Sequence, residues 1–227
     1  MATNPGPLLA IDAASPRSSV AVGLDGRLLA AVDAPGGPGA RPLLALVDEA
    51  MRLAALSPRD LAHLVAVRGP GSFTGVRLAL ATAWALHEAL ECPASSITTF
   101  EALAWQGVGG PERILALVDA LRGEWYCQLL AVDRPPMAIS EARILSGEEL
   151  RRLPPGSAIG FGVSALAREL PDQQLLEAQP LAGPLAIALS LAPPTPDPGR
   201  LLTPLYLRAP TPEVRLAKGP SPGPPGA

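Results

Sequence analysis

Cysteine, histidine and lysine are scarce in this chain of 227 residues. The two cysteines, Cys92 and Cys127, are far apart and lie in apolar stretches, a pattern typical of buried free thiols. The two histidines, His63 and His87, lack the HxxxH or HExxH spacing of paired metal ligands. Lys218 is the only lysine among eighteen basic residues. The sequence therefore predicts no metal site and no cofactor held by this chain itself.

The chain also lacks a charge excess and a long apolar run. Its net charge of −3 gives no broad attraction to nucleic acid or to an anionic membrane, so any contact with RNA is expected through a partner. No window offers about 18 uninterrupted apolar residues, and no leader-like segment opens the chain. An apolar fraction of 48% with 17% charged residues is typical of a compact globule. We expect a cytoplasmic protein that does not enter the membrane.

The first hundred residues predict an alternation of strands and helices. A short buried strand at 8–12 ends in Asp12, and an Asp25-Gly26 turn between two β-prone runs indicates a hairpin. The predicted order is strand 8–12, strands 18–24 and 28–33, helix 42–56, strand 63–68, helix 76–90 and strand 96–99. This order is typical of an α/β fold.

A similar pattern restarts after residue 110. The predicted elements are strand 114–119, which again ends in an aspartate, strand 125–132, helix 146–153, strand 158–162 and helix 164–170. Two such units favour a duplicated architecture. We therefore expect an N-terminal lobe over 1–108, a C-terminal lobe over 109–209 and a disordered tail rich in proline and glycine over 210–227.

A glycine-rich loop, Gly69-Pro-Gly-Ser-Phe-Thr-Gly-Val-Arg77, joins a predicted strand to a predicted helix. Ser72 and Thr74 are both candidate N-caps, and the helix terminus could attract an anion such as phosphate. Arg77 opposes the helix dipole in the first turn, so we expect an acidic partner or an anionic ligand for it. The spacing matches neither a P-loop nor a dinucleotide fingerprint. A ligand site and a tight structural turn both remain open.

The two predicted helices of the first lobe carry more apolar surface than a helix packed on a sheet needs. Burial inside a large core is one interpretation, and contact with another subunit is the other, which we favour. The residues predicted to form this contact are Leu43, Leu46, Val47, Ala50, Val76, Ala79, Leu80 and Ala83.

Few residues are suited to catalysis. Asp12 and Asp119 end equivalent strands, where related kinases hold phosphate, but Asp12 is followed by two alanines. No Ser-His-Asp arrangement and no general base beside a nucleophile are evident. The candidate ligand-binding residues are Asp12, Ser15, Gly69, Gly71, Ser72, Thr74, Gly75 and Arg77.

These motifs resemble the TsaB (YeaZ) family over roughly residues 8–210. The resemblance rests on Leu9-Ala-Ile-Asp12 with Ser15-Pro16, on the glycine loop with Arg77, on Asp119-Ala120 with Arg122-Gly-Glu124, and on Pro204-Leu-Tyr-Leu-Arg208. It implies an α/β fold of two RNase H-like lobes, that of the actin/hexokinase/Hsp70 (ASKHA) superfamily.

The resemblance also implies a role in forming N6-threonylcarbamoyladenosine at position 37 of tRNAs that read ANN codons. In this family the catalytic subunit is a paralogue, TsaD, which binds the metal, and the ATPase TsaE joins the pair. The chain would then be a noncatalytic partner of TsaD that reaches tRNA only through the complex and forms a homodimer when alone. ATP and metal would be bound by the partner subunits.

Three departures from the family pattern remove polar groups: Asp12-Ala-Ala14, Gly39-Ala-Arg-Pro42 and Asp119-Ala-Leu121. Two other functions stay open. One is an active enzyme of the same superfamily, either an ATP-dependent phosphotransferase or a metallopeptidase-like protein. The other is a homodimer whose groove binds a small ligand.

Overall fold

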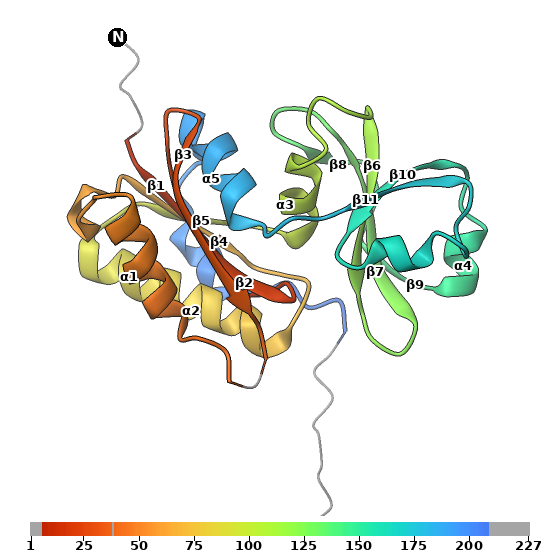
Figure 1. Cartoon of the computed structure of the whole chain (residues 1–227), viewed down its shortest axis with the longest axis horizontal. Coiled ribbons are helices and arrows are strands. Elements are labelled where there is room, and N and C mark those ends of the chain that lie inside the picture. Colours follow the sequence, from red (N-terminus) through yellow and green to blue (C-terminus); the bar gives the residue numbers. More distant parts are fainter. Residues whose placement is uncertain (1–5, 38, 209–227) are drawn as a thin grey trace, which may run out of the picture.

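The computed structural model describes residues 6–37 and 39–208, and the predicted tail at 210–227 lies outside them. Two α/β lobes stand side by side (Figure 1). The first half contains β1 (Leu8–Asp12), β2 (Arg17–Leu24), β3 (Arg27–Pro35), α1 (Leu43–Leu53), β4 (His63–Val67), α2 (Phe73–Leu90), β5 (Ala94–Ile97) and α3 (Thr99–Trp105). The second half contains β6 (Arg113–Asp119), β7 (Glu124–Ala131), β8 (Met137–Ala138), β9 (Arg143–Ser146), α4 (Gly147–Arg151), β10 (Gly156–Gly160), β11 (Gln173–Glu177) and α5 (Ala182–Leu191). Short 3₁₀ turns occupy Pro58–Asp60, Val163–Leu166 and Pro198–Leu202.

The two sheets share one topology, which confirms the predicted duplication. The first has the strand order β3-β2-β1-β4-β5, and the second has β8-β7-β6-β10-β11 with β9 also paired to β7. In each sheet the first strand lies at the centre, antiparallel to the strand after it and parallel to a later one. The strand-ending aspartates, Asp12 and Asp119, are therefore at equivalent positions.

Local signals explain most of the element boundaries. Asp25 and Gly26 both adopt positive φ, as a tight two-residue hairpin turn requires. The side chain of Ser72 caps α2 by accepting the Gly75 amide, so this helix begins at Phe73, three residues earlier than predicted. α1 ends at Leu53 because the chain turns to positive φ at Ala55. The helix predicted at 164–170 is only a 3₁₀ turn.

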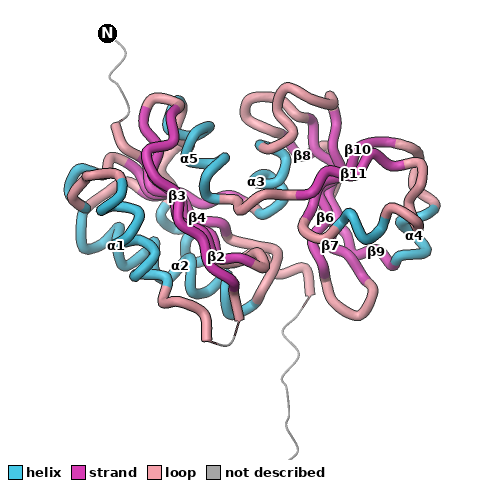
Figure 2. Tube along the Cα trace, in the orientation of Figure 1, coloured by secondary structure: helices cyan, strands magenta, loops and turns pink. Residues whose placement is uncertain are grey.

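The helices lie on both faces of the first sheet (Figure 2). α1 and α2 cover one face, and α5 packs on β1, β2 and β3 from the other. α3 packs on β6 and β7 of the second sheet. The boundary expected at 108/109 separates the two sheets along the chain, but each sheet is covered by a helix from beyond that boundary. Residues 182–202, which we expected in the second lobe, pack on the first.

Most buried side chains form one continuous core around the first sheet and α5, with Phe100 among the largest of its fully buried residues. A smaller cluster lies within the second lobe around Leu117, Leu150 and Val163. Helices in the described parts of the chain are all too short or too polar to cross a membrane.

Candidate functional site in the cleft between the lobes

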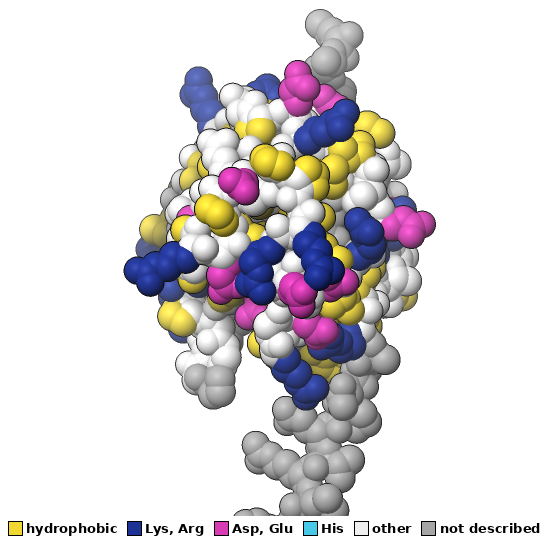
Figure 3. Space-filling model, turned by 90° about the vertical axis from the view of Figure 1, so that its right-hand side faces the viewer, with side chains coloured by type: hydrophobic (Ala, Val, Ile, Leu, Met, Phe, Trp, Pro, Cys, Tyr) yellow, Lys and Arg dark blue, Asp and Glu magenta, His cyan; other side chains and the backbone are white. Residues whose placement is uncertain are grey.

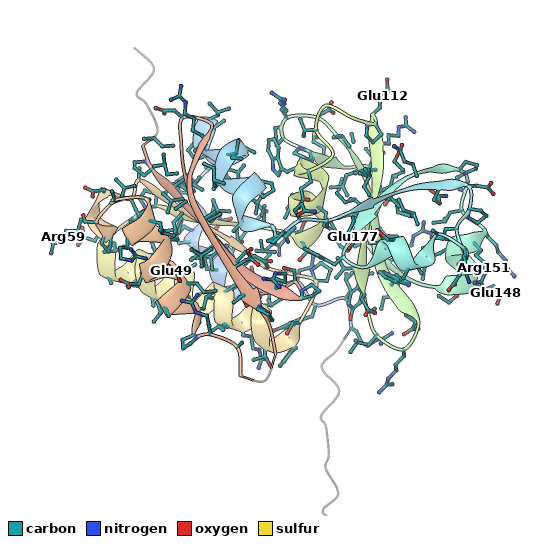
Figure 4. All side chains as sticks on the ribbon, viewed as in Figure 1. Glu49, Arg59, Glu112, Glu148, Arg151 and Glu177 are labelled. Atoms are coloured by element: carbon teal, nitrogen blue, oxygen red, sulfur yellow. The ribbon has the colours of Figure 1, made fainter. Side chains whose placement is uncertain are left out.

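A cleft of about 1830 Å³ lies between the lobes and is lined from both of them. The turn after β1, the glycine loop and the turn after β6 meet there. In Figure 4, Glu177 lies on the side of the second lobe that faces the first, whereas Glu148 and Arg151 lie at its outer end. Polar residues that line the cleft include Ser15, Arg17, Asp33, Ser72, Thr74, Asp119, Arg122, Glu124, Tyr126, Glu177 and Arg208.

The carboxylate of Asp12 is turned inward rather than into this cleft. Asp12 is fully buried, behind Ala14 and Ser15, which line the cleft. Its Oδ1 accepts the Ala14 amide at 2.7 Å, and its Oδ2 accepts the Ser15 hydroxyl. Burial raises the pKa of Asp12 to about 6, against the lowering effect of these hydrogen bonds. Asp12 thus stabilises its own turn.

The raised pKa of Asp12 predicts a pH-dependent stability. The folded state holds the proton more tightly than the unfolded chain, where the pKa is 3.8, so ionising Asp12 opposes folding. The contribution of the Asp12 carboxyl to the free energy of unfolding is greatest below about pH 4 and falls until about pH 6. We expect the free energy of unfolding of the unmodified chain to fall by about 3 kcal/mol between these pH values, relative to that of the Asp12→Asn variant. Urea unfolding of both proteins at pH 4 and pH 7 measures this difference, and parallel pH profiles would refute it.

The second lobe repeats this turn. Asp119 Oδ1 accepts the amide of Leu121 at 2.7 Å, two residues on, just as Asp12 accepts Ala14. Leu121, Arg122 and Gly123 all adopt positive φ, and this sharp turn presents Arg122 to the cleft. The repeated strand-ending aspartate was visible in the sequence. The other cleft residues of the second lobe were not predicted.

The glycines of the loop allow it to pack directly on the turn after β1. A Cβ on Gly75 would lie 1.7 Å from the backbone oxygen of Ala13, and one on Gly71 would lie 2.2 Å from that of Ala14. Gly71 also has a φ of +157° and Gly69 of +97°. These glycines are therefore required by close contact of two backbone segments, which favours the structural interpretation of the loop.

Several polar groups of the loop already have partners within the protein. The Ser72 amide donates to Ala14 O at 2.8 Å, and the Gly75 amide donates to Ser72 Oγ at 3.2 Å. Gly69 O accepts from the Thr99 amide. An anion at this helix terminus would compete for amides that these contacts use. Of the predicted ligand residues, Ser15, Gly71, Ser72 and Thr74 line the cleft, while Gly69 and Gly75 lie against backbone.

Arg77 contacts aromatic rings, and its partners among the described residues are not acidic, which corrects the expectation of an acidic partner. Its guanidinium lies 3.8 Å from the centre of the Phe73 ring, and its Nε donates to the Tyr206 hydroxyl at 3.0 Å. The Phe73 and Tyr206 rings are 5.0 Å apart. A cation stacked on an aromatic face is stabilised without a carboxylate. Arg77 therefore links the segment that contains Tyr206 to the first turns of α2.

The charges that line the cleft do not favour a polyphosphate. The four acidic residues Asp33, Asp119, Glu124 and Glu177 outnumber the three arginines. Arg17 pairs with Asp33, and Arg208 pairs with Glu124, so two of those arginines are already partnered by carboxylates. Within residues 6–37 and 39–208, no group of three His, Cys, Asp or Glu side chains is arranged to hold a metal.

All the residues predicted as a subunit contact are buried within the chain itself. Leu43, Leu46, Val47, Ala50, Val76, Ala79, Leu80 and Ala83 are at most 7% exposed. Their apolar surface is used by the sheet, because α1 packs on β2 and β3, α2 packs on β4 and β1, and the two helices touch. These side chains are core residues in this structure, so a contact surface must use other residues.

The outward side of α2 carries exposed apolar residues beside the exposed polar side chains of Thr74, Arg77 and Glu88. Leu78 is 45% exposed, Ala81 and Ala85 are exposed on the same side, and Trp84 is half-buried beside them. What we call the α2 face consists of Leu78 with Ala81 and Ala85, which follow Leu78 by three and seven residues and so lie on the same side of the helix. By contrast, basic and acidic side chains are interspersed over the outer face of the second lobe (Figure 3).

Comparison with known proteins places this chain in a family. A model described as "TsaD: tRNA N6-adenosine threonylcarbamoyltransferase" matches residues 40–157, just over half of the chain. The chain belongs to the TsaD/TsaB (YeaZ) family. The resemblance found in the sequence is thereby confirmed.

Two curated relatives are TsaB proteins. The chain is 35% identical over 122 residues to "tRNA threonylcarbamoyladenosine biosynthesis protein TsaB" of Escherichia coli K12, covering 52% of each chain. It is 38% identical over 74 residues to the Bacillus subtilis protein of the same name, covering 33% of this chain and 32% of that one. The matched region thus spans about half the length of the first relative and about a third of the second.

The solved structure of YeaZ from Pseudomonas aeruginosa has the same fold. It matches with a TM-score of 0.72 at 24% identity, over 89% of this chain and all of that one. The duplicated sheets, with a central first strand in each, form the two RNase H-like lobes that the sequence predicted. The predicted fold class is confirmed.

Proposed function

We propose that this chain is a noncatalytic subunit that works with a TsaD paralogue to form N6-threonylcarbamoyladenosine at position 37 of tRNAs that read ANN codons. The names of its TsaB relatives support the pathway, and the match to the TsaD model fits a pair of paralogues. ATP and metal are bound by the partner subunits, TsaE joins the complex, and tRNA is contacted through the complex.

The main support for a noncatalytic role is that the two strand-ending aspartates accept hydrogen bonds within their own turns. Asp12 and Asp119 occupy the positions from which a kinase-like cleft would act, but each is engaged by its own turn. Asp12 is also closed off from the cleft by burial. With an excess of carboxylates around it, such a cleft is poorly suited to hold nucleotide phosphates.

The α2 face is the surface we propose for TsaD, and for a second copy when the chain is alone. Its apolar residues lie on the longest helix, and Leu78 is 45% exposed there. An exposed apolar helix face of this kind gains free energy when a partner covers it.

Reconstitution of the modification tests this function. The TsaD and TsaE proteins of the same organism are incubated with tRNA, ATP and threonylcarbamoyl-adenylate, with and without this chain. We expect modified adenosine to accumulate only when the chain is present. The chain without TsaD should form none. Equal yields with and without the chain, or product formed by the chain without TsaD, would refute the proposal.

A further inference from the structure

Two motifs that carry the family resemblance meet across the cleft. Pro204-Leu-Tyr-Leu-Arg208 closes the described part of the chain, and Arg122-Gly-Glu124 lies at the turn from β6 to β7. One guanidinium nitrogen of Arg208 donates to the Glu124 carboxylate, 84 residues away in the chain. The other reaches the backbone oxygen of Ala120 at 3.5 Å. The two motifs therefore build one contact between a C-terminal segment and the second lobe.

The segment at residues 203–208, which we call the strap, is firmly attached to the first lobe. The Leu205 amide donates to Arg68 O, just beyond β4, at 2.8 Å. The Tyr206 hydroxyl accepts from Arg77 Nε of α2 at 3.0 Å. Apolar side chains of the strap also pack against the main core. The strap is thus fixed to the first lobe before it reaches its last residue.

The other end of the strap contacts the second lobe through Arg208. The side chains of the Arg208–Glu124 ion pair are 34% and 38% exposed. An ion pair that is open to water contributes little to stability and is weakened by salt, so it breaks and re-forms readily. The strap therefore has one firm end on the first lobe and one releasable end on the second.

The chain also connects the lobes covalently. It crosses to the second lobe between β5 and α3 and returns between β11 and α5. Gln106, just after α3, accepts the Gln179 amide at 2.9 Å and donates to Gln179 O at 3.0 Å, which ties α3 to the returning segment. In Figure 1 this segment passes between the lobes above the blue strap. A few residues in such connections are enough to form a hinge between domains.

We propose that the Arg208–Glu124 pair is a latch that sets the separation of the two lobes. While the pair is made, the strap holds the lobes at the separation seen in this structure. When it is released, the lobes swing apart about the connections beside Gln106 and Gln179. Because strap residues line the cleft, release also widens the cleft. This latch is a property of the chain by itself and does not depend on the proposed role in tRNA modification.

Spin labels on Thr74→Cys and Arg122→Cys in the full chain measure the separation. Both positions are exposed and line the cleft from opposite lobes. The native Cys92 and Cys127 are buried, and burial raises their thiol pKa values to about 11 and 12, so the labels react with the introduced cysteines. By pulsed electron paramagnetic resonance we expect a single narrow distribution of label distances while the latch is intact.

Arg208→Gln and Glu124→Gln should each lengthen the mean label distance by more than about 2 Å and broaden its distribution. The double variant should lengthen the distance no further, because both substitutions break the same contact. Arg151→Gln is the control, since Arg151 forms a surface ion pair with Glu169 within the second lobe. It should leave the label distance unchanged.

The latch residues are partly exposed, so these variants should fold, and thermal unfolding checks that they do. An unchanged label distance in folded Arg208→Gln and Glu124→Gln would overturn the proposal. An equal lengthening in Arg151→Gln would also overturn it, because the effect would then come from loss of any surface ion pair. Additive lengthening in the double variant would show that the two side chains do not form one latch.

Discussion

Gly75→Ala is expected to destabilise the protein by about 3–5 kcal/mol, enough to unfold much of it at 37 °C. The added Cβ would lie 1.7 Å from the backbone oxygen of Ala13. Neither side can yield easily, because Ala13 follows a central strand and Gly75 lies in the first turn of a capped helix. Urea unfolding at pH 7 measures the loss.

Gly147→Ala is the matched control for this prediction. Gly147 is also in the first turn of a serine-capped helix, but its added Cβ would be in ordinary contact, 3.7 Å from the Glu169 side chain. We expect this substitution to increase the free energy of unfolding by no more than about 1 kcal/mol. If the Gly75→Ala variant were as stable as this control, Gly75 would not be required for packing, and the interpretation of the loop as a ligand site would be favoured instead.

The double substitution Leu78→Glu and Ala81→Glu should abolish association with TsaD and with a second copy. Two carboxylates would be desolvated in an apolar contact, which should weaken binding by more than about 100-fold. Both side chains are exposed, so the variant should fold normally. Co-purification with TsaD and sedimentation of the isolated chain measure the two associations.

Met137→Glu is the control for the α2 face, since Met137 is 60% exposed but belongs to the second lobe. It should bind TsaD like the unmodified chain. Leu46→Glu, in contrast, should unfold the protein, because Leu46 is fully buried. Full binding by a folded Leu78→Glu, Ala81→Glu variant would show that the contact lies elsewhere.

Local sequence signals were sufficient for several elements of the first lobe, including those that bring the turn after β1 and the glycine loop to the cleft, but not for β11, which ends at the cleft residue Glu177. The strand ending in Asp12, the Asp25-Gly26 hairpin and the strand–loop–helix unit around the glycine loop each follow from short-range patterns, and all are present. The duplication could also be predicted, because both lobes open with a strand that ends in aspartate.

Five elements were missed, α3, β8, β9, β11 and α5, and three of them show different reasons. α3 carries a capping box, Thr98 with Glu101, that could have revealed it. α5 is apolar on all sides, so it has no helical period to detect, and it contains Gly183 and Pro184 near its start. β11 has little strand propensity in its sequence and depends on pairing with β10.

The residues predicted as a subunit contact are core residues because a pattern measures how much of a helix is apolar, not what covers it. In α1 and α2 the widest apolar strip is used by the chain's own sheet, and the less conspicuous α2 face is left outside. Arg77 is a similar case, since its partner Tyr206 is 129 residues away in the chain.

The most direct test of the noncatalytic role uses a chain with both Asp12→Asn and Asp119→Asn in the reconstituted modification reaction. A catalytic carboxylate contributes about 10²–10⁴-fold to a rate. If this chain acts only as a partner of TsaD, the folded double variant should support modification within about twofold of the unmodified chain. A loss of 100-fold or more, with TsaD binding intact, would contradict the account and assign the chemistry to this cleft.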